Sequence, residues 1–99
     1  MTEEEFEREV LSAPGPVLVD FATHWCPPCR AMAPVLAALA AERSGRLIVN
    51  SVDGDTSQAL VTRCDVRSFP TVIAFSGGRE IARAVGLMHK DKLVKQLKL

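Results

Sequence analysis

The sequence is poor in cysteine, in aromatic residues and in long apolar runs. It has three cysteines, one tryptophan and no tyrosine among 99 residues, and three cysteines are too few for the disulfide framework of a small secreted protein. No apolar run approaches the roughly 20 residues of a membrane-spanning helix. Met1 leads into an acidic stretch rather than an apolar leader. We therefore expect a cytoplasmic location and no membrane partner.

An excess of charge of one sign is also missing. The 12 Lys and Arg residues balance the 12 Asp and Glu residues, so the formal net charge is zero. Without an excess of positive charge, the chain has no overall field that would attract the phosphates of nucleic acid. Nucleic acid is therefore not an expected partner.

The sequence does have enough apolar side chains to fold. Hydrophobic residues make up 47% of the chain, which is ample for one core, whereas chains divide into separate cores only at much greater length. We find no internal repeat, linker or low-complexity segment. A single domain over residues 1–99 is expected.

Hydrophobic periodicity predicts alternating helices and strands. Thr2 and Glu5 fit the capping box that begins a helix, and Val17–Ala22 is a nearly continuous apolar run, typical of a central strand covered on both faces. The predicted helices cover residues 3–11, 26–43, 56–64 and 90–99, and the predicted strands cover 17–22, 47–52, 71–75 and 80–85. This order predicts an α/β fold with a mixed sheet of four strands flanked by four helices.

Cys26 and Cys29 lie where the central strand meets the long helix. A thiol at the start of a helix faces unpaired backbone N–H groups and the positive end of the helix dipole, which favour the thiolate. Cys26 is therefore the expected nucleophile. Cys29, three residues on, is within disulfide reach and could resolve a mixed disulfide. The alternative is half of a zinc site, for which only Cys64, His24 and His89 could supply the missing ligands.

Landmarks along the chain resemble those of the thioredoxin family in the same order. They are Val17-Leu18-Val19-Asp20-Phe21, Trp25-Cys26-Pro27-Pro28-Cys29-Arg30, Met32-Ala33-Pro34, Val66-Arg67-Ser68-Phe69-Pro70-Thr71, Gly78 and Gly86. The resemblance runs from about Thr2 to Leu99. It implies the thioredoxin fold and reduction of protein disulfides through a Cys26/Cys29 dithiol, without metal or organic cofactor.

The resemblance also implies roles for other residues. Asp20 would be the buried acid that exchanges a proton with Cys29. Pro70 would be the cis-proline beside the two sulfurs, leaving the backbone of Phe69 free to pair with substrate. The apolar docking surface around Cys26 would consist of Trp25, Pro27, Phe69, Gly86 and Leu87. The implied partners are disulfide-containing proteins and a reductase or thiol system that donates electrons.

The sequence departs from the family's pattern in two respects that affect these roles. Ser51 stands where many thioredoxins carry a lysine, so Asp20 is expected to lack a cationic neighbour. The strand that usually precedes the first helix is absent, which leaves the strand at 47–52 as an open edge. A homodimer through this strand is one hypothesis for what covers it.

Two further matters stay open at this point. Cys64 is either a small packed side chain or an exposed regulatory thiol. The same residues could also serve an oxidant or isomerase of protein disulfides, or a binding module that docks partners independently of redox state.

Overall fold

Strand β1 (Val17–Ala22) lies inside a four-stranded sheet in the computed structural model, which describes all 99 residues. The strand order is β2-β1-β3-β4; β1 pairs in parallel with β2 (Ile48–Asp53) and antiparallel with β3 (Thr71–Ser76). β4 (Arg79–Val85) completes an antiparallel hairpin with β3. The predicted mixed sheet of four strands is confirmed.

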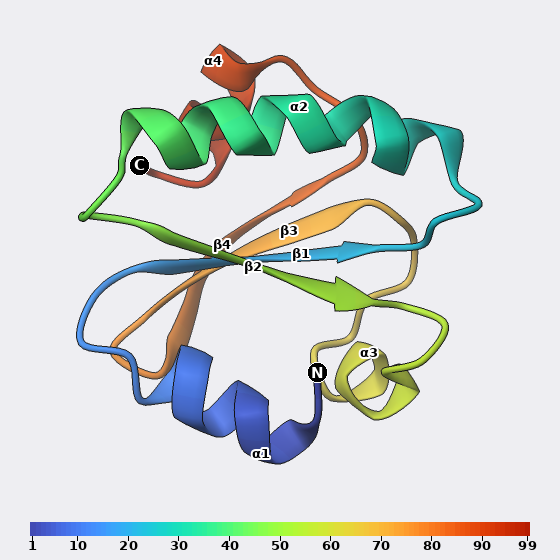
Figure 1. Cartoon of the computed structure of the whole chain (residues 1–99), viewed down its shortest axis with the longest axis vertical. Helices are drawn as coiled ribbons and strands as arrows, with labels where there is room; N and C mark the ends of the chain where they lie inside the picture. Colours follow the sequence, from blue (N-terminus) through green and yellow to red (C-terminus); the bar gives the residue numbers. More distant parts are fainter.

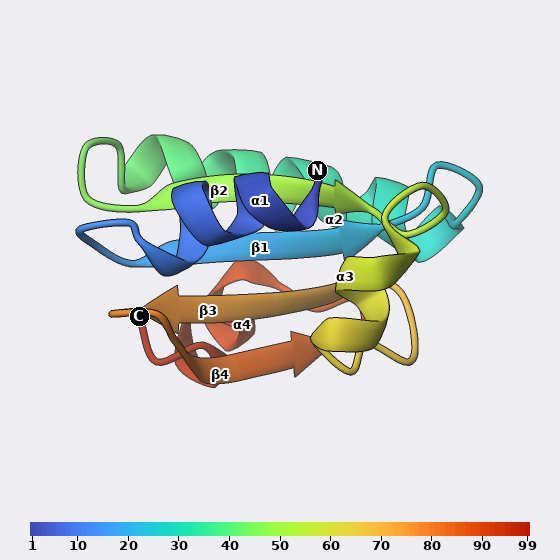
Figure 2. The same cartoon turned by 90° about the horizontal axis from the view of Figure 1, so that it is seen from below.

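Helices cover both faces of the sheet (Figure 1). The long helix α2 (Pro27–Glu42) and α4 (Lys90–Gln96) lie on one face, and α1 (Glu3–Phe6), its continuation η1 (Glu7–Leu11) and α3 (Gln58–Arg63) lie on the other. Figure 2, seen from below, shows α1 running along the sheet while α3 lies near the ends of the strands. The fold is therefore three layers, with the sheet in the middle.

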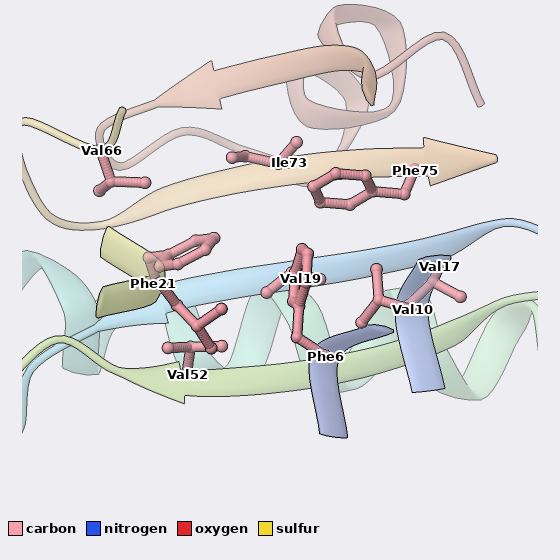
Figure 3. Packing of buried hydrophobic residues seen from close by; sticks show 10 residues of the cluster. Phe6, Val10, Val17, Val19, Phe21, Val52, Val66, Ile73 and Phe75 are labelled. Atoms are coloured by element: carbon pink, nitrogen blue, oxygen red, sulfur yellow. The ribbon is translucent and has the colours of Figure 1, made fainter. Parts of the chain in front are cut away.

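Each face of the sheet has its own apolar core. On the α1 side, Phe6 and Val10 pack against Val19 and Phe21 of β1, and the ring of Phe6 meets that of Phe75 edge-on at a centroid distance of 5.4 Å (Figure 3). On the α2 side, the core consists of Leu18, Met32, Leu36, Leu39, Leu47, Val72, Ala74, Ala84, Leu93 and Leu97. Side chains alternate along a strand, so β1 contributes to both cores.

The first helix begins as the sequence predicts. The Thr2 hydroxyl accepts a hydrogen bond from the Glu5 N–H, and the Glu5 carboxylate accepts one from the Thr2 N–H, which is the predicted capping box. Its second half, η1, is a π-helix rather than the expected continuation of an α-helix. The prediction was correct about the extent of this segment but not about its winding.

Element boundaries differ from the predictions by a few residues. The helix expected at 56–64 begins at Gln58 and ends at Arg63, and the last helix ends at Gln96 instead of Leu99. Strand β2 is at one edge of the sheet, as expected. No helix is both long enough and apolar enough to span a membrane.

Because both faces of β1 are buried, shortening one of its side chains is predicted to destabilise the protein strongly. Leu18 is fully buried at the centre of the α2-side core, and a Leu→Ala change at such a position costs about 2–5 kcal/mol. We expect Leu18→Ala to lower the free energy of unfolding in urea by that amount. Ile48→Ala, at a side chain 51% exposed on the edge strand, is the control and should cost less than about 1 kcal/mol. Equal losses in the two variants would contradict this account of the core.

Candidate functional site

The two cysteines lie at the beginning of α2, directly after the turn that follows β1. Cys26 is the N-cap residue, and its sulfur accepts a hydrogen bond from the Cys29 N–H at 3.3 Å. Pro27 and Pro28 occupy the first turn, where a missing N–H leaves no helical bond unmade. Cys26 and Cys29 are both buried, with exposed fractions of 5% and 6%. The backbone of α2 therefore holds an N–H donor against the sulfur of Cys26.

A second segment reaches the same sulfur from the other side. The Phe69–Pro70 peptide bond is cis, and the Phe69 carbonyl oxygen lies 3.7 Å from Cys26 Sγ, whose thiol donates to it. Pro70 is buried, and its own carbonyl accepts a hydrogen bond from the Gly86 N–H at 2.9 Å. The structure thus brings Cys26, Phe69, Pro70 and Gly86 together, although they come from three separate parts of the chain.

Asp20 and Cys29 line one open pocket of about 410 Å³ behind the dithiol. Ala22, Thr23 and Ser51 also line it, and all three are small side chains. One carboxylate oxygen of Asp20 is buried without a hydrogen-bond partner. The pocket therefore places a carboxylate and the second thiol beside a shared space wide enough for water.

Burial sets the protonation behaviour of these two groups. It raises the pKa of Asp20 from 3.8 to about 6, with no cationic neighbour opposing the shift, as the Ser51 substitution predicted. Burial is also the main reason that the pKa of Cys29 rises to about 11, and the hydrogen bond with Cys26 adds to it. Cys29 is therefore a thiol at neutral pH and needs a proton acceptor before it can attack.

The remaining candidate residues are exposed around the dithiol or packed beneath it. Trp25 and Leu87 are 59% and 52% exposed, and Pro27 is exposed as well. Phe69 is half-buried and packs against the α1-side core. Trp25, Pro27 and Leu87 thus present apolar side chains to solvent.

Sequence reasoning missed two residues that support these positions. Gly54 leaves room for Phe69, because a Cβ there would lie 2.5 Å from the Phe69 ring. Asp55 accepts a hydrogen bond from the Trp25 indole N–H at 2.9 Å. Both belong to the stretch after β2, which carries no motif, so only the fold connects them to the dithiol.

Cys64 lies apart from the pair, at the end of α3, and is half-buried. Burial raises the pKa of its thiol, which makes it less reactive than an exposed cysteine. No group of three or more His, Cys, Asp or Glu side chains is close enough to hold a metal ion.

Comparisons with known proteins agree with this geometry. The sequence model of the thioredoxin family matches residues 1–99. The thioredoxin of Mycobacterium tuberculosis is 41% identical over 97 residues, covering 98% of this chain and 84% of that protein. The thioredoxin of Chlamydia trachomatis is 42% identical over 95 residues, covering 96% and 90%. The bifunctional thioredoxin reductase/thioredoxin of Mycobacterium leprae is 41% identical over 97 residues, which are 98% of this chain but only 21% of that protein.

The raised pKa of Asp20 predicts how stability depends on pH. Because the pKa is about 6 in the folded protein and 3.8 ordinarily, the native state binds more protons than the unfolded chain between about pH 4 and pH 6, and stability falls as the pH rises through this range. Asp20→Asn has no carboxylate to bury. Allowing for partial solvent exposure, we expect it to be about 1–2 kcal/mol more stable than wild type in urea at about pH 7.5 and equal to it near pH 3.5.

Glu9→Gln removes one negative charge at an exposed position and controls for the change in net charge. A constant difference between Asp20→Asn and wild type at both pH values would mean that burial of the carboxylate is not the cause.

Proposed function

The chain belongs to the thioredoxin family and is a thiol–disulfide oxidoreductase that reduces protein disulfides, and we propose that Cys26 and Cys29 carry the exchange with Asp20 as proton acceptor. The observation that carries this assignment is the contact of the Cys29 N–H with Cys26 Sγ at the N-terminus of α2. It distinguishes the two sulfurs, since Cys26 receives a donor and Cys29 is a buried thiol with a raised pKa.

The first step is attack by the Cys26 thiolate on one sulfur of the substrate disulfide. The substrate S–S bond breaks, a bond forms between Cys26 and the attacked sulfur, and the other substrate sulfur leaves as a thiolate and takes up a proton. The half-buried Phe69, whose carbonyl lies beside Cys26 Sγ, would supply the backbone groups that pair with an extended substrate segment.

The second step is attack by Cys29 on Cys26. Asp20, in the shared pocket, takes the Cys29 proton, and a carboxylate with a pKa of about 6 is mostly ionised at neutral pH and is therefore able to do so. The mixed disulfide breaks, the Cys26–Cys29 disulfide forms, and the second substrate sulfur leaves as a thiol after protonation. Two electrons have then passed from the protein dithiol to the substrate.

Substrate docking is assigned to the apolar residues around Cys26. Trp25, Pro27 and Leu87 offer exposed apolar area, and Gly86 adds backbone without a side chain that would obstruct approach. Phe69 contributes its backbone, while its ring stays packed below. A surface of this kind binds by apolar contact and backbone pairing, so it suits many disulfide-containing proteins.

The oxidised Cys26–Cys29 pair requires an electron donor to begin a new cycle. A reductase or another thiol system is the proposed partner, and the relative named as a bifunctional thioredoxin reductase/thioredoxin supports it by joining both activities in one protein. We also propose that residues 1–99 act as one domain in the cytoplasm, where a reducing environment keeps such a dithiol available.

A homodimer through β2 is a second proposal about partners. β2 is at the edge of the sheet, where its outer backbone groups have no neighbouring strand, and Ile48 on it is 51% exposed. An edge strand with an exposed apolar side chain is suited to pairing with another strand.

Cys29→Ser is expected to trap the mixed disulfide. Without the Cys29 sulfur the second step cannot occur, so Cys26 stays bonded to the substrate while steady-state reduction of a protein disulfide falls by about a hundredfold or more. Mass spectrometry after mixing with a disulfide-bonded peptide should show one peptide attached at Cys26. Cys64→Ser is the matched control and should reduce the peptide at the wild-type rate. A Cys29→Ser protein that forms no adduct would refute the assignment of the nucleophile.

Sedimentation equilibrium tests the homodimer. We expect the wild-type protein to associate as its concentration rises, and Ile48→Lys to remain monomeric because a charge on an edge strand opposes pairing. A wild-type protein that is monomeric at every concentration would exclude self-association through β2.

A further inference from the structure

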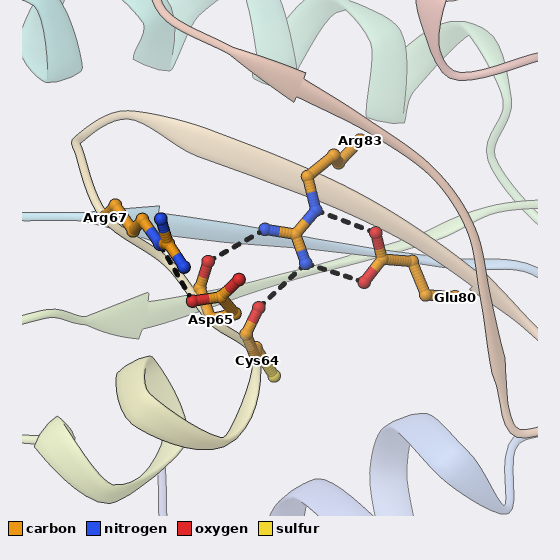
Figure 4. Close-up of polar contacts among 5 residues, drawn as sticks. All are labelled: Cys64, Asp65, Arg67, Glu80 and Arg83. Atoms are coloured by element: carbon orange, nitrogen blue, oxygen red, sulfur yellow. Dashed lines mark hydrogen bonds and ion pairs between the residues drawn. The ribbon is translucent and has the colours of Figure 1, made fainter.

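Arg83 of β4 makes the densest set of side-chain hydrogen bonds in the molecule (Figure 4). Its Nε and Nη2 donate to the two carboxylate oxygens of Glu80, both at 2.7 Å. Its Nη1 donates to the carbonyl oxygen of Asp65 at 3.1 Å, and Nη2 also donates to that of Cys64 at 2.7 Å. One guanidinium therefore connects β4 to a segment far from it in sequence.

The two carbonyls that Arg83 binds lie where α3 ends. Cys64 is the C-cap of α3, so its carbonyl has no partner within the helix, and Asp65, the next residue, turns the chain away with a φ of 53°. A cation at this end also interacts favourably with the negative end of the helix dipole. The fork of the guanidinium suits two adjacent carbonyls, whereas a lysine would offer a single point of charge.

The segment from Cys64 to Pro70 delivers the Phe69 carbonyl to Cys26, and it contains neither helix nor strand. Inside the protein it is held by Val66, whose side chain is buried in the α1-side core. Its first residues also donate backbone hydrogen bonds to α3, and the Phe69 ring packs against the same core. Arg83 of β4 binds the beginning of the segment, and the N–H of Gly86, directly after β4, donates to the Pro70 carbonyl at its end. Arg83 of β4 and Gly86, the residue directly after β4, thus contact the two ends of the segment.

Apart from the contact of Cys26 Sγ with the Phe69 carbonyl, the other side-chain hydrogen bonds of the segment join residues two or three apart. Arg67 pairs with Asp65, two residues away, and its side chain is 84% exposed. The Thr71 hydroxyl donates to the Ser68 carbonyl, three residues away. Neither contact sets the distance between the segment and β4.

We propose that Arg83 is a positioning residue for disulfide exchange, acting through the carbonyls of Cys64 and Asp65 to place the Phe69 backbone for pairing with a peptide substrate. The inference rests on the proposed function, because it concerns the segment that flanks Cys26. Glu80 orients the guanidinium of Arg83, so the two residues act together. Arg83 touches neither sulfur, so its loss should weaken the binding of a peptide and leave the chemistry of the thiols intact.

The test compares two substrates that differ in whether they need the backbone of Phe69. One is a disulfide-bonded peptide, and the other is a small aromatic disulfide with no peptide backbone, dithiobis(nitrobenzoate). For Arg83→Met we expect the KM for the peptide to rise about five- to tenfold with kcat within about twofold of wild type, and the rate with the aromatic disulfide to change less than about twofold. Arg79→Met, on the same strand and exposed, loses the same charge and should match wild type with both substrates.

Two results would overturn the role of Arg83. One is an unchanged peptide KM in Arg83→Met, and the other is an equal loss with both substrates, which would indicate general damage to the fold. If Arg83→Met does not fold, Glu80→Gln decides the matter, since it weakens the orientation of the guanidinium but keeps Arg83; a rise in KM for the peptide alone supports the proposal, and no rise refutes it. A wild-type protein that fails to reduce the aromatic disulfide would refute the proposed function itself, and the role of Arg83 with it.

Discussion

Strand β1 is covered by side chains on both faces, and the positions of the reactive groups depend on this burial. Leu18 belongs to one core and Phe21 to the other, so the strand cannot move without exposing apolar surface on both sides. Its carboxyl end leads within a few residues to the N-terminus of α2, where Cys26 is the N-cap. The same burial surrounds Asp20 and raises its pKa. The burial of β1 therefore contributes both to the stability of the core and to the environment of the dithiol.

The sulfur of Cys26 meets one contact that is local and one that is not. The Cys29 N–H is three residues away, and its hydrogen bond to the sulfur needs only the first turn of α2. The Phe69 carbonyl is 43 residues away and arrives only when β3 has paired with β1 and β4. The first turn of α2 is therefore enough for one of the two contacts of the Cys26 sulfur, whereas the other requires the sheet.

This division explains what could be predicted from the sequence. The capping box at Thr2, the buried run of β1 and the N-cap position of Cys26 depend on near neighbours, and the patterns predicted them correctly. Gly54 against Phe69 and the Arg83 hydrogen bond to the Cys64 carbonyl, across 19 residues, depend on how the strands and loops come together. Neither has a local signal. The π-helical winding of Glu7–Leu11 was missed for a different reason. The spacing of apolar residues indicates which face of a helix is buried, but it does not indicate how many residues separate the donor and acceptor of each backbone hydrogen bond.

The pocket behind the dithiol has a further consequence for how the protein works in the presence of a bound substrate. Its lining includes Asp20, Cys29 and Ser51 but none of the exposed apolar residues around Cys26. A protein that contacts Trp25 and Leu87 alone would touch none of the residues that line this pocket. Water could then exchange with the carboxylate while the front is occupied, so the proton released at Cys29 would have a route to bulk solvent that does not cross the interface. Entry of the substrate and exit of the proton would then use different openings of one small domain.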